Sequence, residues 1–322
     1  MSPLIRHFFA ALSLALPLAC GAQTFPSKPV KIIVGFPAGG PLDAHARLLA
    51  DRLGQALGQP VIIDYRAGAG GTVGAEFVAK SEPDGHTLLM ANTGTMVINP
   101  AVYTKLPYQT LRDFVPIART AQQPLALVVH PDVKARNIGE LVALAKAAPG
   151  RLNYGSAGNG GISHLVPEMF KQATGTFIVH IPYRGSAPAF TDLMAGQVQL
   201  MAESIPQAAQ YVKAGKLRAL AVTSRDRNAA LPEVPTMIEA GLKDFEVVGF
   251  YGVLAPAGTP KAAVDKLSAA FKATLDTPEL RSRMVTQGAD PAFLGAEDFT
   301  KFLAAEMPRW AKVVKDSGTK LD

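Results

Sequence analysis

The chain has little cysteine and little tryptophan: of its 322 residues, one is a cysteine and one is a tryptophan. One cysteine cannot form a disulfide within the chain, so the fold cannot depend on disulfide bonds. Charge of one sign is not concentrated either. The formal net charge is +6, but the sequence has no run of like charges and no basic stripe with interleaved aromatic residues. These absences predict a mildly basic soluble surface and do not predict nucleic acid as a partner.

Long apolar runs are absent beyond the N-terminal region. Residues 8–18 are almost entirely apolar and lie between Arg6 and the small residues 19–22. This order is typical of a secretory signal peptide, and the apolar stretch is too short to cross a bilayer. We therefore predict a signal peptide at residues 1–22 and a periplasmic protein.

The cysteine, Cys20, lies inside this segment and leaves an alternative open. Cleavage before Cys20 would leave a lipidated N-terminus, whereas cleavage after Ala22 would remove the cysteine. Pro17 stands where lipoprotein signals usually have a larger aliphatic residue, which favours cleavage after Ala22. A lipid anchor at Cys20 is the alternative prediction.

Nucleotide and metal motifs are missing as well. The glycine-rich stretch at 68–74 lacks a glycine at the third position of the dinucleotide fingerprint, and no glycine turn is followed by Lys-Ser or Lys-Thr. The six histidines are scattered, without a pair at metal-ligand spacing. The sequence therefore predicts neither a cofactor nor a metal.

Short β-branched runs alternate with amphipathic stretches along the rest of the chain, which indicates an α/β fold. The proline-containing segment 99–118 is expected to be mostly loop. Strands are predicted at residues 30–34, 61–64, 87–92, 125–129, 152–155, 177–182, 200–203, 217–223 and 247–254. Helices are predicted at residues 43–57, 71–80, 138–148, 163–174, 187–195, 205–214, 261–275, 278–287 and 297–314.

The alternating strands and helices form two series along the chain. They predict two lobes, each with a mostly parallel sheet flanked by helices. The first lobe is expected to comprise residues 23–122 with 247–322, and the second residues 123–246. Two crossings between the lobes imply a hinge, and lobes joined in this way commonly close on a ligand. We expect a monomer.

The first candidate site is the turn that leads from the strand at 30–34 into the next helix. Gly39 and Gly40 allow a sharp turn, and the unpaired N–H groups of a helix start favour anions. An ordinary turn without a ligand is the alternative. For Asp43 we favour a role in capping or in stabilising the helix dipole over direct ligand contact.

The second candidate site is the turn at 153–165, which has four glycines in seven residues and the hydroxyls of Ser156 and Ser163. Two such turns, one in each lobe, could face each other and hold a carboxylate. For His164 a structural role is favoured. A hydrolase with a Ser156–His164 pair stays a minor alternative, because Tyr154 replaces the glycine that a nucleophile elbow needs.

Several motifs in a characteristic order resemble the Bug/TctC family, the extracytoplasmic solute receptors of tripartite tricarboxylate transporters. The motifs are PAGGPLD at 37–43, YGSAG at 154–158, PYRG at 182–185, GKLRALAVTS at 215–224 and LAPAGTP at 254–260. The resemblance implies a two-lobed periplasmic binding-protein fold (type II-like) that closes on a small organic carboxylate. It also implies transient contact with the transporter's membrane subunits, and no catalysis.

When the family's site is carried over by position, the resemblance implies that backbone amides of the two glycine turns hold the ligand carboxylate. Thr93 and Glu203 would face the rest of the ligand. The expected ligand-binding residues are Phe36, Ala38, Gly39, Gly40, Leu42, Asp43, Thr93, Ser156, Ala157, Gly158, Ser163, His164 and Glu203.

The chain departs from the family pattern at two places. Leu42 replaces the usual threonine or serine, and Ala202-Glu203 replaces a common Phe-Asp pair. Loss of a hydroxyl at Leu42 and a charge on Glu203 predict a monocarboxylate with an apolar or aromatic body in preference to citrate. The alternative is that Glu203 points away and pairs with a lysine or arginine. A sensory subunit for a membrane kinase and an exported hydrolase are the alternative functions.

Overall fold

The structure is a computed structural model that describes residues 25–286 and 289–320. The predicted signal peptide and Cys20 lie outside the described residues. The strands are β1 (Val30–Val34), β2 (Val61–Tyr65), β3 (Thr87–Asn92), β4 (Phe114–Val129), β5 (Asn153–Ser156), β6 (Val179–Pro182), β7 (Leu200–Ser204), β8 (Arg218–Val222), β9 (Val248–Pro256) and β10 (Asp290–Gly295). The helices are α1 (Pro41–Leu57), α2 (Thr72–Ala79), α3 (Asn99–Val102), α4 (Thr110–Asp113), α5 (Ile138–Ala147), α6 (Ile162–Thr174), α7 (Ser186–Met194), α8 (Ile205–Lys213), α9 (Lys261–Leu275), α10 (Pro278–Thr286) and α11 (Ala296–Ser317).

A first group of strands has the order β2-β1-β3-β9-β4, with β10 also paired to β4. Strand β1 runs parallel to β2 and β3, and β9 is antiparallel to β3. Ile32 packs in one apolar cluster with Leu49 of α1, whereas Ile33 packs in another with Val78 of α2. Both faces of β1 are therefore covered, which is why four of its five residues are β-branched and buried, Lys31 being the exception.

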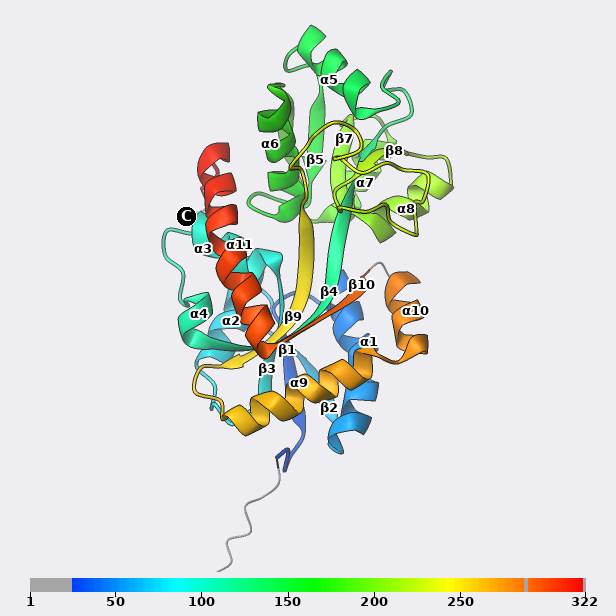
Figure 1. The fold of residues 1–322 in the computed structure, drawn as a ribbon. Coiled ribbons are helices and arrows are strands. Elements are labelled where there is room, and N and C mark those ends of the chain that lie inside the picture. Colours follow the sequence, from blue (N-terminus) through cyan, green and yellow to red (C-terminus); the bar gives the residue numbers. More distant parts are fainter. Residues whose placement is uncertain (1–24, 287–288, 321–322) are drawn as a thin grey trace, which may run out of the picture.

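A second group of strands comprises β4, β7, β5 and β6 in that order, with β8 also paired to β4. Leu127 on β4 packs in a cluster with Leu165 of α6, and Val128 packs on the opposite face with Leu193 of α7. Figure 1 shows this second group with α5 to α8 at one end of the molecule and the first group at the other.

Strands β4 and β9 run between the two groups (Figure 1). The pairing of β4 changes at one step, because Pro124 pairs with Val248 of β9 whereas Leu125 pairs with Ser204 of β7. The fully buried Thr223 lies beside this step, and its hydroxyl accepts a hydrogen bond of 2.9 Å from the N–H of Leu125.

Two regions differ from the sequence prediction. The segment 99–118, expected to be mostly loop, contains α3, α4 and the first part of β4. Pro116 is accommodated where the register of β4 against β9 shifts, which is the kind of position that tolerates proline in a strand. Strand β10 was not predicted, because its six half-buried residues show no alternation and include Pro291.

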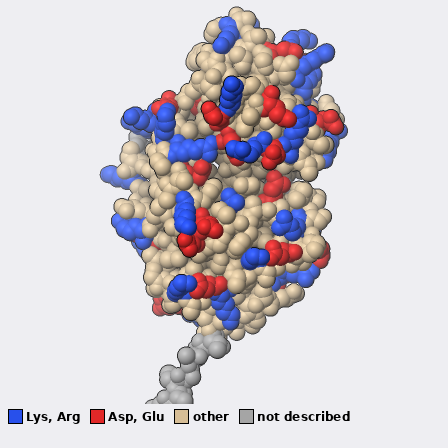
Figure 2. Space-filling model, in the orientation of Figure 1, with Lys and Arg blue, Asp and Glu red and all other residues tan. Residues whose placement is uncertain are grey.

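The described surface carries both signs of charge. On the face drawn in Figure 2, lysine and arginine side chains are interspersed with aspartate and glutamate. Within residues 25–286 and 289–320, no helix is long and apolar enough to cross a membrane.

Candidate ligand-binding site

A cavity of about 330 Å³ lies between the two groups of strands. Its walls come from both groups and from the strands that join them. The lining residues are Phe36, Pro41, Gly70, Asn92, Thr93, Gly94, Asn99, Tyr103, Gln123, Leu125, Ala157, Gly158, Asn159, Gly160, Gly161, Ile162, Ser163, Ser186, Glu203, Ser204, Gln207, Gly249 and Tyr251.

The turn between β5 and α6 forms one wall, and side chains of the turn itself hold its shape. The N–H of Ala157 donates to Ser163 Oγ at 3.0 Å, and the N–H of Gly158 donates to Ser156 Oγ at 3.2 Å. Gly160 N–H donates to His164 Nδ1 at 3.0 Å. Three amides that were expected to bind a ligand are thus already occupied.

The first N–H groups of α6 are the better donors toward the cavity. Helix α6 begins at Ile162, and its N-cap residue, Gly161, supplies no side-chain hydrogen bond. The N–H groups of Ile162 and Ser163 have no partner within the helix. Both residues line the cavity, so this helix start can bind an anion.

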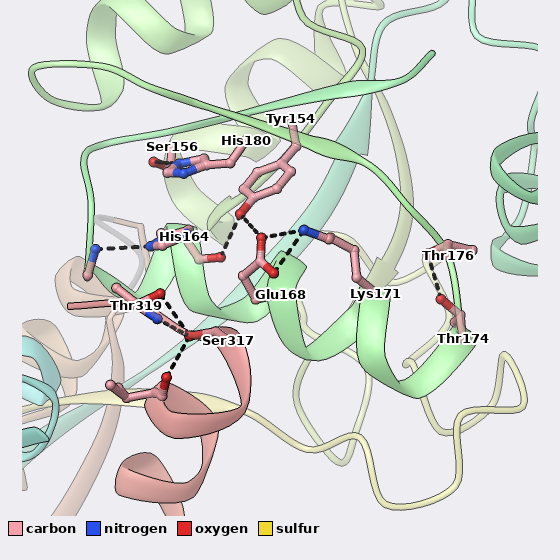
Figure 3. Close-up of polar contacts among 12 residues, drawn as sticks. Tyr154, Ser156, His164, Glu168, Lys171, Thr174, Thr176, His180, Ser317 and Thr319 are labelled. Atoms are coloured by element: carbon pink, nitrogen blue, oxygen red, sulfur yellow. Dashed lines mark hydrogen bonds and ion pairs between the residues drawn. The ribbon is translucent and has the colours of Figure 1, made fainter. Parts of the chain in front are cut away.

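Ser156 and His164 lie close to Tyr154 and His180 beside this turn (Figure 3). Ser156 is fully buried, and its hydroxyl lies 2.6 Å from Nε2 of His180 on β6. The rings of His164 and His180 stack with centroids 4.0 Å apart and an interplanar angle of 9°. Burial lowers the pKa of His180 to about 3, with the nearby His164 adding to the effect, and burial lowers the pKa of His164 as well.

This geometry does not match the hydrolase alternative. The histidine that contacts Ser156 is His180 and not His164. Within the described residues neither imidazole hydrogen-bonds to a carboxylate, and Ser156 does not line the cavity. Both histidines therefore act as neutral supports of the turn.

Asp43 supports the other glycine turn. Its carboxylate accepts hydrogen bonds from Gly39 N–H at 2.7 Å, Arg47 Nε at 2.8 Å and Tyr65 Oη at 2.6 Å. Burial acts to raise the pKa of the Asp43 carboxyl, but the hydrogen bonds from Gly39, Tyr65 and Arg47 outweigh it and lower the pKa. Asp43 therefore caps the turn, which is the role that the sequence favoured.

The expected ligand-binding residues fall into two sets. Those that line the cavity are Phe36, Thr93, Ala157, Gly158, Ser163 and Glu203. Those outside its lining are Ala38, Gly39, Gly40, Leu42, Asp43, Ser156 and His164.

In the region of the first glycine turn, Phe36 and Pro41 line the cavity. Ala38 and Gly39 are exposed. Leu42 is 4% exposed and packs in the apolar cluster under α1. The expectation that Leu42 alters the ligand site is therefore not supported, because its side chain points into the core.

Glu203, near the end of β7, also lines the cavity and is 8% exposed. Its carboxylate accepts a hydrogen bond of 2.6 Å from the Ser186 hydroxyl and one of 2.9 Å from the Ser204 N–H. Burial raises the pKa of Glu203, against the effect of these two hydrogen bonds. The alternative in which Glu203 pairs with a lysine or arginine is wrong, since its partners in the described structure are two serines.

Sequence reasoning missed Gln207 and Tyr251, which also line the cavity. Gln207 lies in the first turn of α8, three residues after the end of β7, so a polar residue just beyond a predicted strand was the available signal. Tyr251 lies inside β9, and nothing in the sequence distinguishes it from its neighbours in that strand.

Among the described residues, no group of three or more histidine, cysteine, aspartate or glutamate side chains is placed to hold a metal ion.

Two groups of strands joined by β4 and β9, with a cavity between them, define a two-lobed solute-binding protein. The sequence profile of the family described as tripartite tricarboxylate transporter family receptor matches residues 45–319, and the chain belongs to this family. The resemblance inferred from the motifs is thereby confirmed.

Relatives agree over nearly the whole chain. The protein BugT of Bordetella pertussis is 38% identical over 318 residues, which cover 98% of this chain and 97% of BugT. The solved structure of Rpa4515 from R. palustris with adipate is 35% identical, has a TM-score of 0.84 and matches 92% of this chain and 100% of that one. The periplasmic binding protein BugD is 37% identical, with a TM-score of 0.79 over 92% of this chain and 99% of its own.

Proposed function

We propose that this protein is an exported, periplasmic receptor that binds a small organic carboxylate in the cavity and delivers it to the membrane subunits of a tripartite tricarboxylate transporter. The observation that carries the proposal is the start of α6, whose unpaired N–H groups belong to residues that line the cavity. Support comes from the related R. palustris protein, whose structure contains adipate.

The proposal includes how the protein works. Residues 23–122 with 247–322 form the first lobe and residues 123–246 the second, and the lobes close on the ligand by bending near Pro124 and Val247. The protein acts as a monomer and binds without catalysis. Export depends on the signal peptide at residues 1–22.

The test is to remove one N–H group without removing the helix. Ile162 is the first residue of α6, a position at which helices accept proline. Ile162→Pro should weaken binding of adipate, or of the best carboxylate in a screen, by about tenfold or more, because a hydrogen bond to a charged group is worth about 1.5–3 kcal/mol. Isothermal titration calorimetry measures the affinity.

Two controls isolate the N–H group. Ile162→Ala shortens the same side chain but keeps the N–H, and it should bind more tightly than Ile162→Pro. Ile138→Pro makes the same substitution at the first residue of α5, which lies outside the cavity, and it should bind like the unmodified protein. Equal affinities of Ile162→Pro and Ile162→Ala would place the carboxylate elsewhere.

A further inference from the structure

The charged groups of the cavity are distributed unevenly. Among the residues that the structure describes, Glu203 is the one carboxyl group that lines the cavity, and no lysine, arginine or histidine lines it. At the α6 side, the helix start favours a negative charge. At the Glu203 side, a second negative charge on the ligand would meet a buried carboxylate without any lining cation between them.

Glu203 is held firmly in this position. The hydroxyl of Ser186 on α7 and the N–H of Ser204 each donate to one of its oxygens. An ionised carboxylate offers about four acceptor positions, so capacity for further donors remains. Burial is the main cause that raises the pKa of Tyr251 on β9, and Glu203 adds to the increase.

A second acceptor lies on the same segment. The Oε1 atom of Gln207 is buried and has no hydrogen-bond partner among the described residues, although Gln207 lines the cavity. A buried acceptor without a partner carries a free-energy cost, because it has lost its hydrogen bonds to water without gaining a donor. A donor on the ligand would remove that cost, and a second carboxylate has none to offer.

We propose, resting on the function proposed above, that Glu203 and Gln207 select a protonated amine at the far end of the ligand. The ligand class is then a zwitterion with one carboxylate and one primary or secondary amine. Its carboxylate lies at the start of α6. Its ammonium group donates to Glu203 and Gln207, in place of the second carboxylate of a diacid.

The experiment compares ligands that differ in one end group. The pairs are succinate with 3-aminopropanoate, glutarate with 4-aminobutanoate, and adipate with 5-aminopentanoate; each pair shares its methylene chain and its first carboxylate. Calorimetry on the purified full-length mature protein near neutral pH gives both affinities. In the best-fitting pair, the amine should bind at least about tenfold more tightly than the diacid, since charge complementarity of this kind decides specificity.

Two variants test the residues. Glu203→Gln keeps the side-chain size but removes the charge, and it should abolish or reverse the preference for the amine. Gln207→Leu should reduce that preference without reversing it. Glu233→Gln removes an exposed acid outside the cavity and should keep the preference of the unmodified protein. Circular dichroism confirms that each variant is folded.

The outcomes separate the two proposals. A diacid that binds the unmodified protein as tightly as its amine partner, or more tightly, overturns the amine inference and leaves carboxylate binding intact. An amine preference that persists in Glu203→Gln also overturns it. No binding by any of the six carboxylates, nor by any other acid in the screen, overturns the proposed function itself.

Discussion

The hydroxyl of Thr223 donates a hydrogen bond of 2.6 Å to the carbonyl oxygen of Val247. The N–H of Val247 returns a bond of 2.9 Å to the carbonyl of Thr223. Because the same hydroxyl also accepts from the N–H of Leu125, one buried side chain joins both segments that cross between the lobes. Thr223 therefore stabilises the region at which bending is proposed.

Replacing Thr223 by valine should destabilise the protein by about 1–3 kcal/mol, because it leaves the N–H of Leu125 and the carbonyl of Val247 buried without this partner. Urea unfolding measures the loss. Thr223→Ser keeps the hydroxyl and removes only a methyl group, so it should lose less than Thr223→Val. If the Thr223→Val protein is as stable as the Thr223→Ser protein, these hydrogen bonds do not contribute to the stability of the fold.

Replacing Gly158 by valine should abolish detectable ligand binding. Gly158 has a φ of +139°, which a β-branched residue rarely adopts, and an added Cβ would lie 3.4 Å from the carbonyl of Tyr183. Gly241→Val is the matched control, because Gly241 also has a positive φ, of +97°, but has open space around it and lies outside the cavity. Calorimetry should show loss of affinity in Gly158→Val alone.

The stability of the protein should fall as the pH is lowered, in part through His45. Burial lowers the pKa of His45 to about 3 from an ordinary value of 6.5, and in the described part of the chain its Nδ1 is buried without a partner. Between pH 3 and pH 6.5, His45 is protonated in the unfolded chain but neutral in the folded protein. Stability from this group is thus complete above pH 6.5 and is lost as the pH falls toward 3, by up to about 1.4 kcal/mol per pH unit.

The variant His45→Leu isolates this contribution. Its free energy of unfolding in urea, followed between about pH 6 and pH 4.5, should fall less steeply with decreasing pH than that of the unmodified protein. Any pH-independent effect of the substitution on the free energy of unfolding leaves this slope unchanged. Equal slopes would mean that His45 does not titrate between the folded and unfolded states in this range.

Ligand binding should make the protein more compact. A site whose walls come from both lobes is complete when the lobes meet, so a ligand shifts an open ensemble toward a closed one. Small-angle X-ray scattering should give a smaller radius of gyration with a saturating carboxylate. The same ligand added to Gly158→Val should cause no change. An unchanged radius in the unmodified protein, with binding confirmed by calorimetry, would show that the lobes are fixed.

Much of the fold could be predicted because local physics determines it. Strand β1 is apolar at four of its five residues since both of its faces are covered. Helices start where glycine turns end because those turns need backbone angles that glycine allows. In contrast, the N-terminal part of β4 and all of β10 are stabilised by pairing with distant segments. Their own residues, with Pro116 and Pro291, do not favour strands.

For the site, the sequence by itself determined which polar and glycine-rich segments follow the strands, and so directed attention to Gly158, Ser163 and Glu203. Only the tertiary structure decided which of their groups are free. Side chains of Ser156 and His164 occupy amides that were expected to bind a ligand. The unpaired acceptor of Gln207 likewise depends on its neighbours. The bonds of Ser156 and His164 join residues only two and four positions apart, but they form because the turn adopts one particular backbone conformation. The order of residues alone does not specify that conformation or which polar groups it leaves unpaired.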